Sequence, residues 1–132
     1  MQTKEAKSIE TQKGPTDYFT GNVWLNRFVK DEGTRCNVAK VTFEPGARTH
    51  WHTHPVSQIL IVTEGKGYVR KDGETVQLLS SGDVVMILAD ERHWHGAMAD
   101  SLFSHIAIQP LDEHGIDVHW LEPVTNEEYE MR

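Results

Sequence analysis

Residues 46–65 read GARTHWHTHPVSQILIVTEG, and two histidines in this stretch occupy alternate positions. Side chains two residues apart lie on the same face of a β-strand, so His52 and His54 should point in one direction. Gln58 follows four residues after His54, beyond Pro55, which can bend the chain. Two imidazoles and an amide oxygen so close together indicate a metal site, because all three are metal ligands.

A second stretch, residues 82–97, reads GDVVMILADERHWHGA. His93 begins a predicted strand here, and two strands of an antiparallel barrel can bring it to the same point as His52, His54 and Gln58. Three imidazoles and one oxygen donor suit manganese, iron, cobalt, nickel or zinc, and they do not suit calcium or magnesium.

The rest of the chain consists of short apolar runs separated by Gly, Asp and Pro. Many short strands at close spacing predict an all-β sandwich or barrel. Asp72-Gly73 is typical of a hairpin turn. Thr125-x-x-Glu128 is a capping box that predicts a short terminal helix over 126–131. The predicted strands are 22–29, 37–44, 48–54, 58–63, 66–71, 74–79, 83–88, 93–98 and 102–109.

Composition limits the location and the partners of the protein. Residues 1–15 are polar and end at Gly14-Pro15, so we expect a flexible arm followed by one domain over 16–132. The formal net charge of -7 argues against nucleic acid, because binding phosphates requires clustered Lys and Arg. No apolar stretch approaches the ~20 residues that span a bilayer. The single cysteine, Cys36, permits no intrachain disulfide, which fits a cytoplasmic protein.

Strand parity groups the side chains that should share a face. In 37–44 the apolar residues alternate with Lys40 and Thr42 and should face inward. Both faces of 102–109 are plausible core faces, so one should line the barrel and the other should pack outside it. The groups that share a face are Ala39 with Val41 and Phe43, Gln58 with Leu60 and Val62, and His105 with Gln109.

The two histidine segments resemble the two sequence motifs of the cupins. The first motif, G-x5-H-x-H-x3-E-x6-G, matches from Gly46 to Gly65, except that Gln58 stands at the glutamate position. In the second, Gly82 and His93 have the expected spacing, whereas Leu88, Asp90 and Ala97 replace the usual Pro, Gly and Asn. This resemblance implies a jelly-roll barrel, also called a double-stranded β-helix, to which we add a short C-terminal helix.

A narrower resemblance covers most of residues 15–132. The segments PTDYFTGNVW, VTFEPGARTHWHTHPVSQILIVTEGKG and SHIAIQ, and the ending VTNEEYEMR, are similar to small manganese cupins that include bacterial (R)-selective hydroxynitrile lyases. That group implies one divalent metal per subunit, manganese, bound by His52, His54, Gln58 and His93. It also implies a substrate pocket that contains Ala39, Val41, His105 and Gln109. His50 stands where a small residue is expected, and we expect it at the rim or surface.

The donor set favours Lewis-acid chemistry. A neutral amide at Gln58 leaves the full charge of a divalent ion, which polarises a substrate oxygen. In a lyase His105 would be the base, with an unperturbed pKa near ~6.5, and Gln109 would orient a small-molecule substrate. The apolar wall would include Phe43, Leu60 and Val62, with His95 at the pocket or beside the ligands.

Other functions remain open from the sequence. Cupins also include dioxygenases, isomerases and non-catalytic binding proteins, so the fold does not settle the reaction. The arm and the first strand, 22–29, have too little apolar surface to complete a sheet edge. We therefore expect a homodimer.

Overall fold

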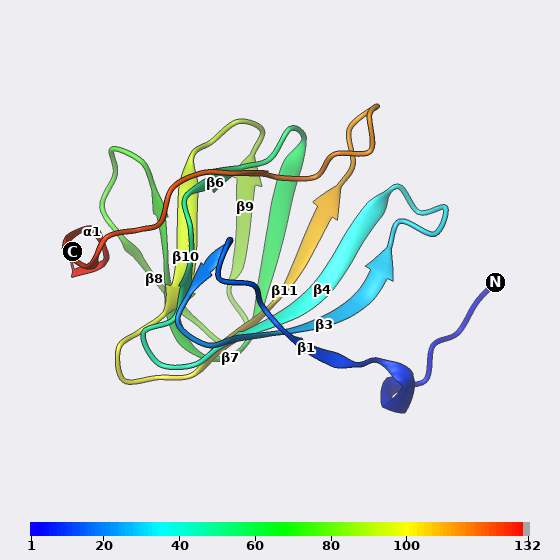
Figure 1. The fold of residues 1–132 in the computed structure, drawn as a ribbon, viewed down its shortest axis with the longest axis horizontal. Coiled ribbons are helices and arrows are strands. Elements are labelled where there is room, and N and C mark those ends of the chain that lie inside the picture. The colour runs from blue at the N-terminus through cyan, green and yellow to red at the C-terminus, as the bar shows by residue number, and fades with distance from the viewer. Residues whose placement is uncertain (131–132) are drawn as a thin grey trace.

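The computed structural model describes residues 1–130, and over them the chain forms one strongly curled antiparallel sheet (Figure 1). The prediction of an all-β barrel with a short C-terminal helix is confirmed. The strands are β1 (Thr11–Lys13), β2 (Phe19–Thr20), β3 (Val23–Lys30), β4 (Cys36–Phe43), β5 (Arg48–Thr49), β6 (His52–Thr53), β7 (Ser57–Lys71), β8 (Gln77–Ser80), β9 (Val84–Leu88), β10 (His93–Ala97), β11 (Phe103–Pro110) and β12 (His119–Trp120). The helices are η1 (Ala6–Ser8), a single 3-10 turn, and α1 (Asn126–Glu130).

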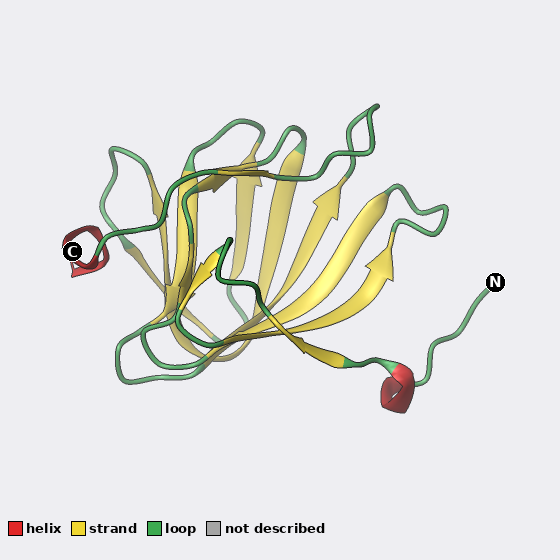
Figure 2. Ribbon diagram, in the orientation of Figure 1, coloured by secondary structure: helices red, strands yellow, loops and turns green. Residues whose placement is uncertain are grey.

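Strand pairing curls the sheet around one interior. The main order is β1-β3-β4-β11-β7-β10-β5-β2, while β8 and β9 both pair with β7. β6 pairs with β10 and with β12. Figure 2 shows the strands curving around one interior, and the segment after β11 crossing one end of the barrel on its way to α1. That segment closes the end at which the histidines lie.

β7 corrects one sequence prediction. We expected two strands, 58–63 and 66–71, with a turn at Glu64-Gly65, but the structure has one strand of 15 residues. Gly65 has a φ of 73°, and a Cβ there would lie 1.7 Å from the carbonyl oxygen of Leu102. The chain bends at Gly65 instead of reversing. The first part of β7 therefore pairs with β9 and β11, and the second part pairs with β8 and β10.

The N-terminal segment contributes a strand that the sequence did not predict. Thr11 to Lys13 pair antiparallel with β3, with Thr11 opposite Asn26. β2 and β12 are likewise absent from the predicted set, because strands of two residues leave no periodic pattern. The division into a flexible arm and one domain stays a prediction. None of the helices within residues 1–130 has the length and apolar character needed to cross a bilayer.

The apolar side chains form two clusters, one inside the barrel and one outside it. The inner cluster includes Phe43, Leu60, Val62 and Phe103, all nearly inaccessible to solvent. The outer cluster joins the sheet to α1 and consists of Trp51, Tyr68, Trp94, Val124 and Tyr129. Trp51 and Trp94 alternate with the histidines on either side of them and pack in this outer cluster.

The C-terminal helix begins at the predicted capping box. The backbone N–H of Glu128 donates to the hydroxyl of Thr125 at 3.1 Å, and the Glu128 carboxylate accepts from the backbone N–H of Thr125 at 2.9 Å. Tyr129 donates from its hydroxyl to the carbonyl of Ala97 at 2.7 Å, which attaches the helix to the sheet. Residue 131, the last of the predicted helix, lies outside the described residues.

Candidate metal centre

Four predicted ligands come from neighbouring strands. His52 on β6 and His93 on β10 are direct partners in the antiparallel ladder. His54 follows β6, and Gln58 lies on β7 with its side chain buried. The ring centroids of His52 and His93 are 4.1 Å apart. The ring centroid of His54 lies 5.0 Å from that of His52 and 5.2 Å from that of His93. The structure thus brings these residues together at one end of the barrel.

Each of these three imidazoles donates from Nδ1 to a backbone carbonyl. The distances are 2.9 Å from His52 to His50, 2.7 Å from His54 to Asp117, and 2.9 Å from His93 to Glu91. A carbonyl only accepts, so Nδ1 carries the hydrogen and Nε2 of the neutral ring keeps a lone pair. This arrangement is typical of metal-binding histidines, whose second nitrogen is held by a carbonyl or carboxylate. Nε2 of His54 is buried and has no partner among the described residues.

Gln58 adds an oxygen to these lone pairs. Its Oε1 lies 3.3 Å from Nε2 of His93. Both atoms are acceptors in this tautomer, so the contact gains nothing unless a cation lies between them. Two ligands at right angles on one ion, with bonds of about 2.1 Å, are about 3 Å apart. The donor set therefore fits a transition-metal ion.

His95 brings a fourth imidazole to the same place. Nitrogen atoms of His52, His93 and His95 all lie within 4.8 Å of one another, a grouping compact enough to hold a metal ion. However, Nδ1 of His95 is 3.0 Å from Nε2 of His105 instead of a backbone carbonyl. Nε2 of His95 is buried without a partner among the described residues. His52 and His93 thus belong to two candidate ligand sets, one completed by His54 and Gln58 and the other by His95.

Burial keeps these histidines neutral. Loss of hydration lowers the pKa of His93 to about 4 and that of His105 to about 3. Burial, followed by the neighbouring imidazoles, lowers the pKa of His52 and His95 well below the usual value. Neutral rings are the form that binds metals. The ordinary pKa expected for His105 does not hold, because the packing around its ring excludes water.

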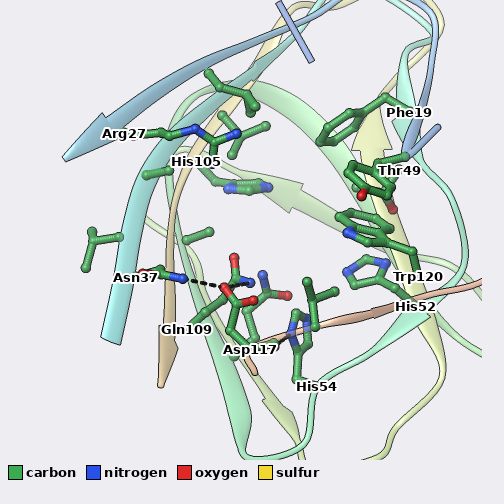
Figure 3. Close-up of a pocket in the computed structure, with 18 of the residues that line it drawn as sticks. Phe19, Arg27, Asn37, Thr49, His52, His54, His105, Gln109, Asp117 and Trp120 are labelled. Atoms are coloured by element: carbon green, nitrogen blue, oxygen red, sulfur yellow. Dashed lines mark hydrogen bonds between the residues drawn. The ribbon is translucent and has the colours of Figure 1, made fainter. Parts of the chain in front are cut away.

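A cavity of about 400 Å³ opens beside these histidines (Figure 3). Among the predicted pocket and catalytic residues, Ala39, Val41, His95, His105 and Gln109 line it. Phe43, Leu60 and Val62 lie in the core behind that wall and do not line the cavity. Phe43 packs against the wall from behind, with its ring centroid 6.0 Å from that of His95 and 5.4 Å from that of His105.

Sequence reasoning missed several residues that line the cavity. Asp117 accepts hydrogen bonds at Oδ2 from Asn37, at 2.8 Å, and from Gln109, at 3.1 Å. Trp120 packs on the ring of His52, with centroids 4.7 Å apart. Asp117 and Trp120 belong to a polar tail where no periodicity points inward. Trp120, a large aromatic residue in a polar segment, was the one sequence feature that could have indicated a partly buried position there.

The prediction that His50 lies at the rim or surface is wrong. Its side chain is only 6% exposed. The backbone N–H of His50 donates to the carbonyl of Tyr18, and its own carbonyl accepts from His52. His50 thus belongs to the framework that orients a candidate ligand.

Comparisons with known proteins agree with the fold. Residues 39–108 match the family model for the cupin domain. The chain is 45% identical over 131 residues to a protein named (R)-mandelonitrile lyase from Granulicella tundricola, covering 98% of each. A crystal structure of a cupin-like protein from Thermotoga maritima is 50% identical, with a TM-score of 0.84 over 89% of both chains. A predicted oxalate decarboxylase from the same organism, 16% identical with a TM-score of 0.72, covers 91% of this chain and all of its own, and it supports the fold alone.

Proposed function

The chain belongs to the cupin family, and on that basis we propose that it is a metal-dependent lyase that cleaves a cyanohydrin into an aldehyde and hydrogen cyanide. The observation that carries the proposal is the convergence of three oriented imidazoles and one amide oxygen beside a small-molecule cavity. The relative named as a mandelonitrile lyase, similar over nearly the whole chain, supports this choice of reaction.

The proposed ligands are His52, His54, Gln58 and His93. Their support is a shared geometry, because each of the three histidines is held at Nδ1 by a carbonyl and presents Nε2 inward. His95 differs, since its Nδ1 faces another imidazole. A divalent ion in this neutral donor set supplies a Lewis acid with its full charge, and we propose manganese.

The proposed base is His105, acting through His95. One hydrogen lies between Nε2 of His105 and Nδ1 of His95, so the tautomers of the two rings are coupled. When His95 holds that hydrogen at Nδ1, its Nε2 is free to accept the hydroxyl proton of a cyanohydrin. Burial makes both rings weak bases. Their protonated forms therefore surrender the proton readily, which suits transfer to the departing cyanide.

Gln109 would hold the substrate in place. Its Nε2 donates to Asp117, so the amide is fixed with its oxygen and its other N–H available. Between this amide and the histidines, the wall is built from the small side chains of Ala39, Val41 and Ala107. An aryl or alkyl group fits such an apolar surface.

The direct test is to incubate manganese-loaded protein with racemic mandelonitrile and to measure benzaldehyde formation and the enantiomer consumed. We expect metal-dependent release of benzaldehyde, at least about a hundredfold slower in His105→Ala. Metal-free protein and the His52→Ala variant serve as controls for the spontaneous reaction. Equal rates with and without metal would refute the proposed lyase. Oxygen uptake by the iron(II) form in place of cleavage would support a dioxygenase instead.

We also propose that the protein is a homodimer, as the exposed strand β1 at the end of the sheet order suggests. Light scattering at micromolar concentration should give twice the chain mass of 15.0 kDa. A mass equal to one chain would refute the dimer.

A further inference from the structure

We propose that the native substrate of this cavity carries a carboxylate group and that Arg27 binds it. The inference deepens the proposed function, because it adds an anionic group to the substrate oxygen that the metal would polarise. It depends on Arg27 itself, a residue that takes no part in the candidate metal centre.

Arg27 shares the inner face of the sheet by strand alternation and lines the cavity, while its side chain stays exposed to solvent. It follows Val23 and Leu25 at alternate positions of β3, and those two residues are buried in the core. Its partner across the ladder is Ala39, and the partner of Ala39 on the next strand is Ala107. Two alanines beside an arginine leave room on the inner face for its side chain and for a ligand. Figure 3 shows the guanidinium extending into the cavity above the ring of His105.

The guanidinium has no ion-pair partner within the described part of the chain. Its one hydrogen bond runs from Nε to the side-chain oxygen of Gln12 at 3.4 Å, which is at the weak limit. The two terminal nitrogens of Arg27, which form the fork that binds a carboxylate, make no hydrogen bond to residues 1–130. The other arginines over these residues have terminal nitrogens bonded to protein oxygens: Arg35, Arg48, Arg70 and Arg92.

Charge around the cavity is opposite in sign to that of the chain. The chain carries a formal net charge of -7, yet Arg27 and Lys30 both line this cavity. Asp117 is the carboxylate on the lining, and its Oδ2 already accepts from Asn37 and Gln109. The neutral histidines add no negative charge, and a divalent ion would make the interior still more positive. A cationic cavity in an acidic protein favours an anionic ligand.

The arrangement selects one class of anion. A guanidinium binds a planar carboxylate through two parallel N–H···O bonds. Between Arg27 and the histidines, the wall is apolar, with Leu25, Val41 and Ala107 among its residues. The ligand is therefore a small molecule with an apolar body, a carboxylate at one end and a hydroxyl or carbonyl oxygen at the other. A cavity of about 400 Å³ suits such a molecule.

The test uses two probes of matched size and shape, the anionic para-hydroxymethylbenzoate and the neutral para-hydroxymethylbenzamide. Their dissociation constants are measured by calorimetry with manganese-loaded and metal-free protein. We expect the carboxylate to bind about tenfold more tightly than the amide in both forms. Arg27→Ala should remove this preference while leaving the dissociation constant of the amide within about twofold. Arg27→Lys should retain part of this preference, since lysine keeps the positive charge but cannot form the two parallel hydrogen bonds of a guanidinium.

Lys66→Ala is the matched control, because Lys66 is an exposed cation on a strand and does not line the cavity. It should leave the preference for the carboxylate unchanged. Circular dichroism establishes that each variant is folded. Equal affinity for the two probes in the unaltered protein, or a preference that survives Arg27→Ala, would overturn the inference. If the protein binds no metal, the proposed function fails, but the preference measured in the metal-free protein still decides the role of Arg27.

Discussion

Nε2 of His93 lies 3.3 Å from Oε1 of Gln58, and the bond from its Nδ1 to the carbonyl of Glu91 leaves no hydrogen on Nε2 to share. Two buried acceptors at this distance repel each other unless a cation lies between them. The contact therefore indicates that the protein holds its ligand atoms in place for an ion, at a cost to the stability of the metal-free fold.

Metal binding should consequently stabilise the protein strongly. At a manganese concentration one hundred times the dissociation constant, we expect about 2.7 kcal/mol of added stability and a rise of about 10 °C in the unfolding midpoint. Differential scanning calorimetry with and without manganese measures this shift. His54→Ala should abolish most of it, whereas His114→Ala, an exposed histidine, should not change it. A midpoint unaffected by metal would contradict the prediction.

Gln58→Glu should separate metal affinity from reactivity. An anionic ligand attracts the ion more strongly and reduces the net charge that polarises the substrate. We expect the metal to bind about tenfold more tightly while kcat for mandelonitrile falls by about tenfold. Gln77→Glu adds the same charge at an exposed position of β8 and is the control. A faster Gln58→Glu enzyme would show that the neutral amide is not what sustains the activity.

The metal-free protein should lose stability as the pH falls below about 6.5. In the folded state the pKa of His93 is about 4 and that of His105 about 3, whereas both rings titrate near 6.5 once unfolded. Between about pH 4 and 6.5 the unfolded chain thus binds more protons, so the free energy of unfolding rises with pH. The slope is about 1.4 kcal/mol per pH unit for each such group. Urea unfolding across this range measures it.

Replacing one buried histidine should reduce that slope by the contribution of one titrating group. His105→Gln should lower it by about 1.4 kcal/mol per pH unit, and His114→Gln should leave it unchanged. Identical slopes for His105→Gln and the unaltered protein would mean that His105 is protonated in the fold.

Gly65→Ala should destabilise the barrel far more than Gly73→Ala. Both glycines have a positive φ, 73° and 82°, which costs an alanine about 1 kcal/mol. At Gly65 the new Cβ would also meet the Leu102 carbonyl at 1.7 Å, whereas nothing lies within 4 Å at Gly73. We expect losses of about 4 and about 1 kcal/mol, respectively, in urea unfolding. Equal losses would show that β7 relaxes at the bend without cost.

The alternation of side chains along a β-strand explains why much of the candidate site could be predicted. His52 and His54 share a face by their spacing, and the ladder then places His93 opposite His52. The same alternation groups Ala39 with Val41 and His105 with Gln109, and the register puts His105 opposite Val41 and Gln109 opposite Asn37. Periodicity is a local property of a strand, so it carries this information without any knowledge of the tertiary fold.

The features of the fold and the site that the sequence did not predict depend on contacts between segments far apart in the chain. Glu64-Gly65 is equally consistent with a turn and with a bend, and the approach of Leu102 decides between them. Asp117 reaches His54 through a backbone carbonyl, which any residue type could supply. The burial of His50 and the lowered pKa of His105 likewise arise from packing that no local pattern encodes.

The central claim is that His52, His54, Gln58 and His93 hold one divalent ion. A crystal structure of the manganese-loaded protein, recorded at the manganese absorption edge, tests it most directly. The account predicts one anomalous peak per chain, bonded to Nε2 of the three histidines and to Oε1 of Gln58, with His95 hydrogen-bonded to His105. A peak bonded to His95 in place of His54, or no peak within the barrel, would contradict it.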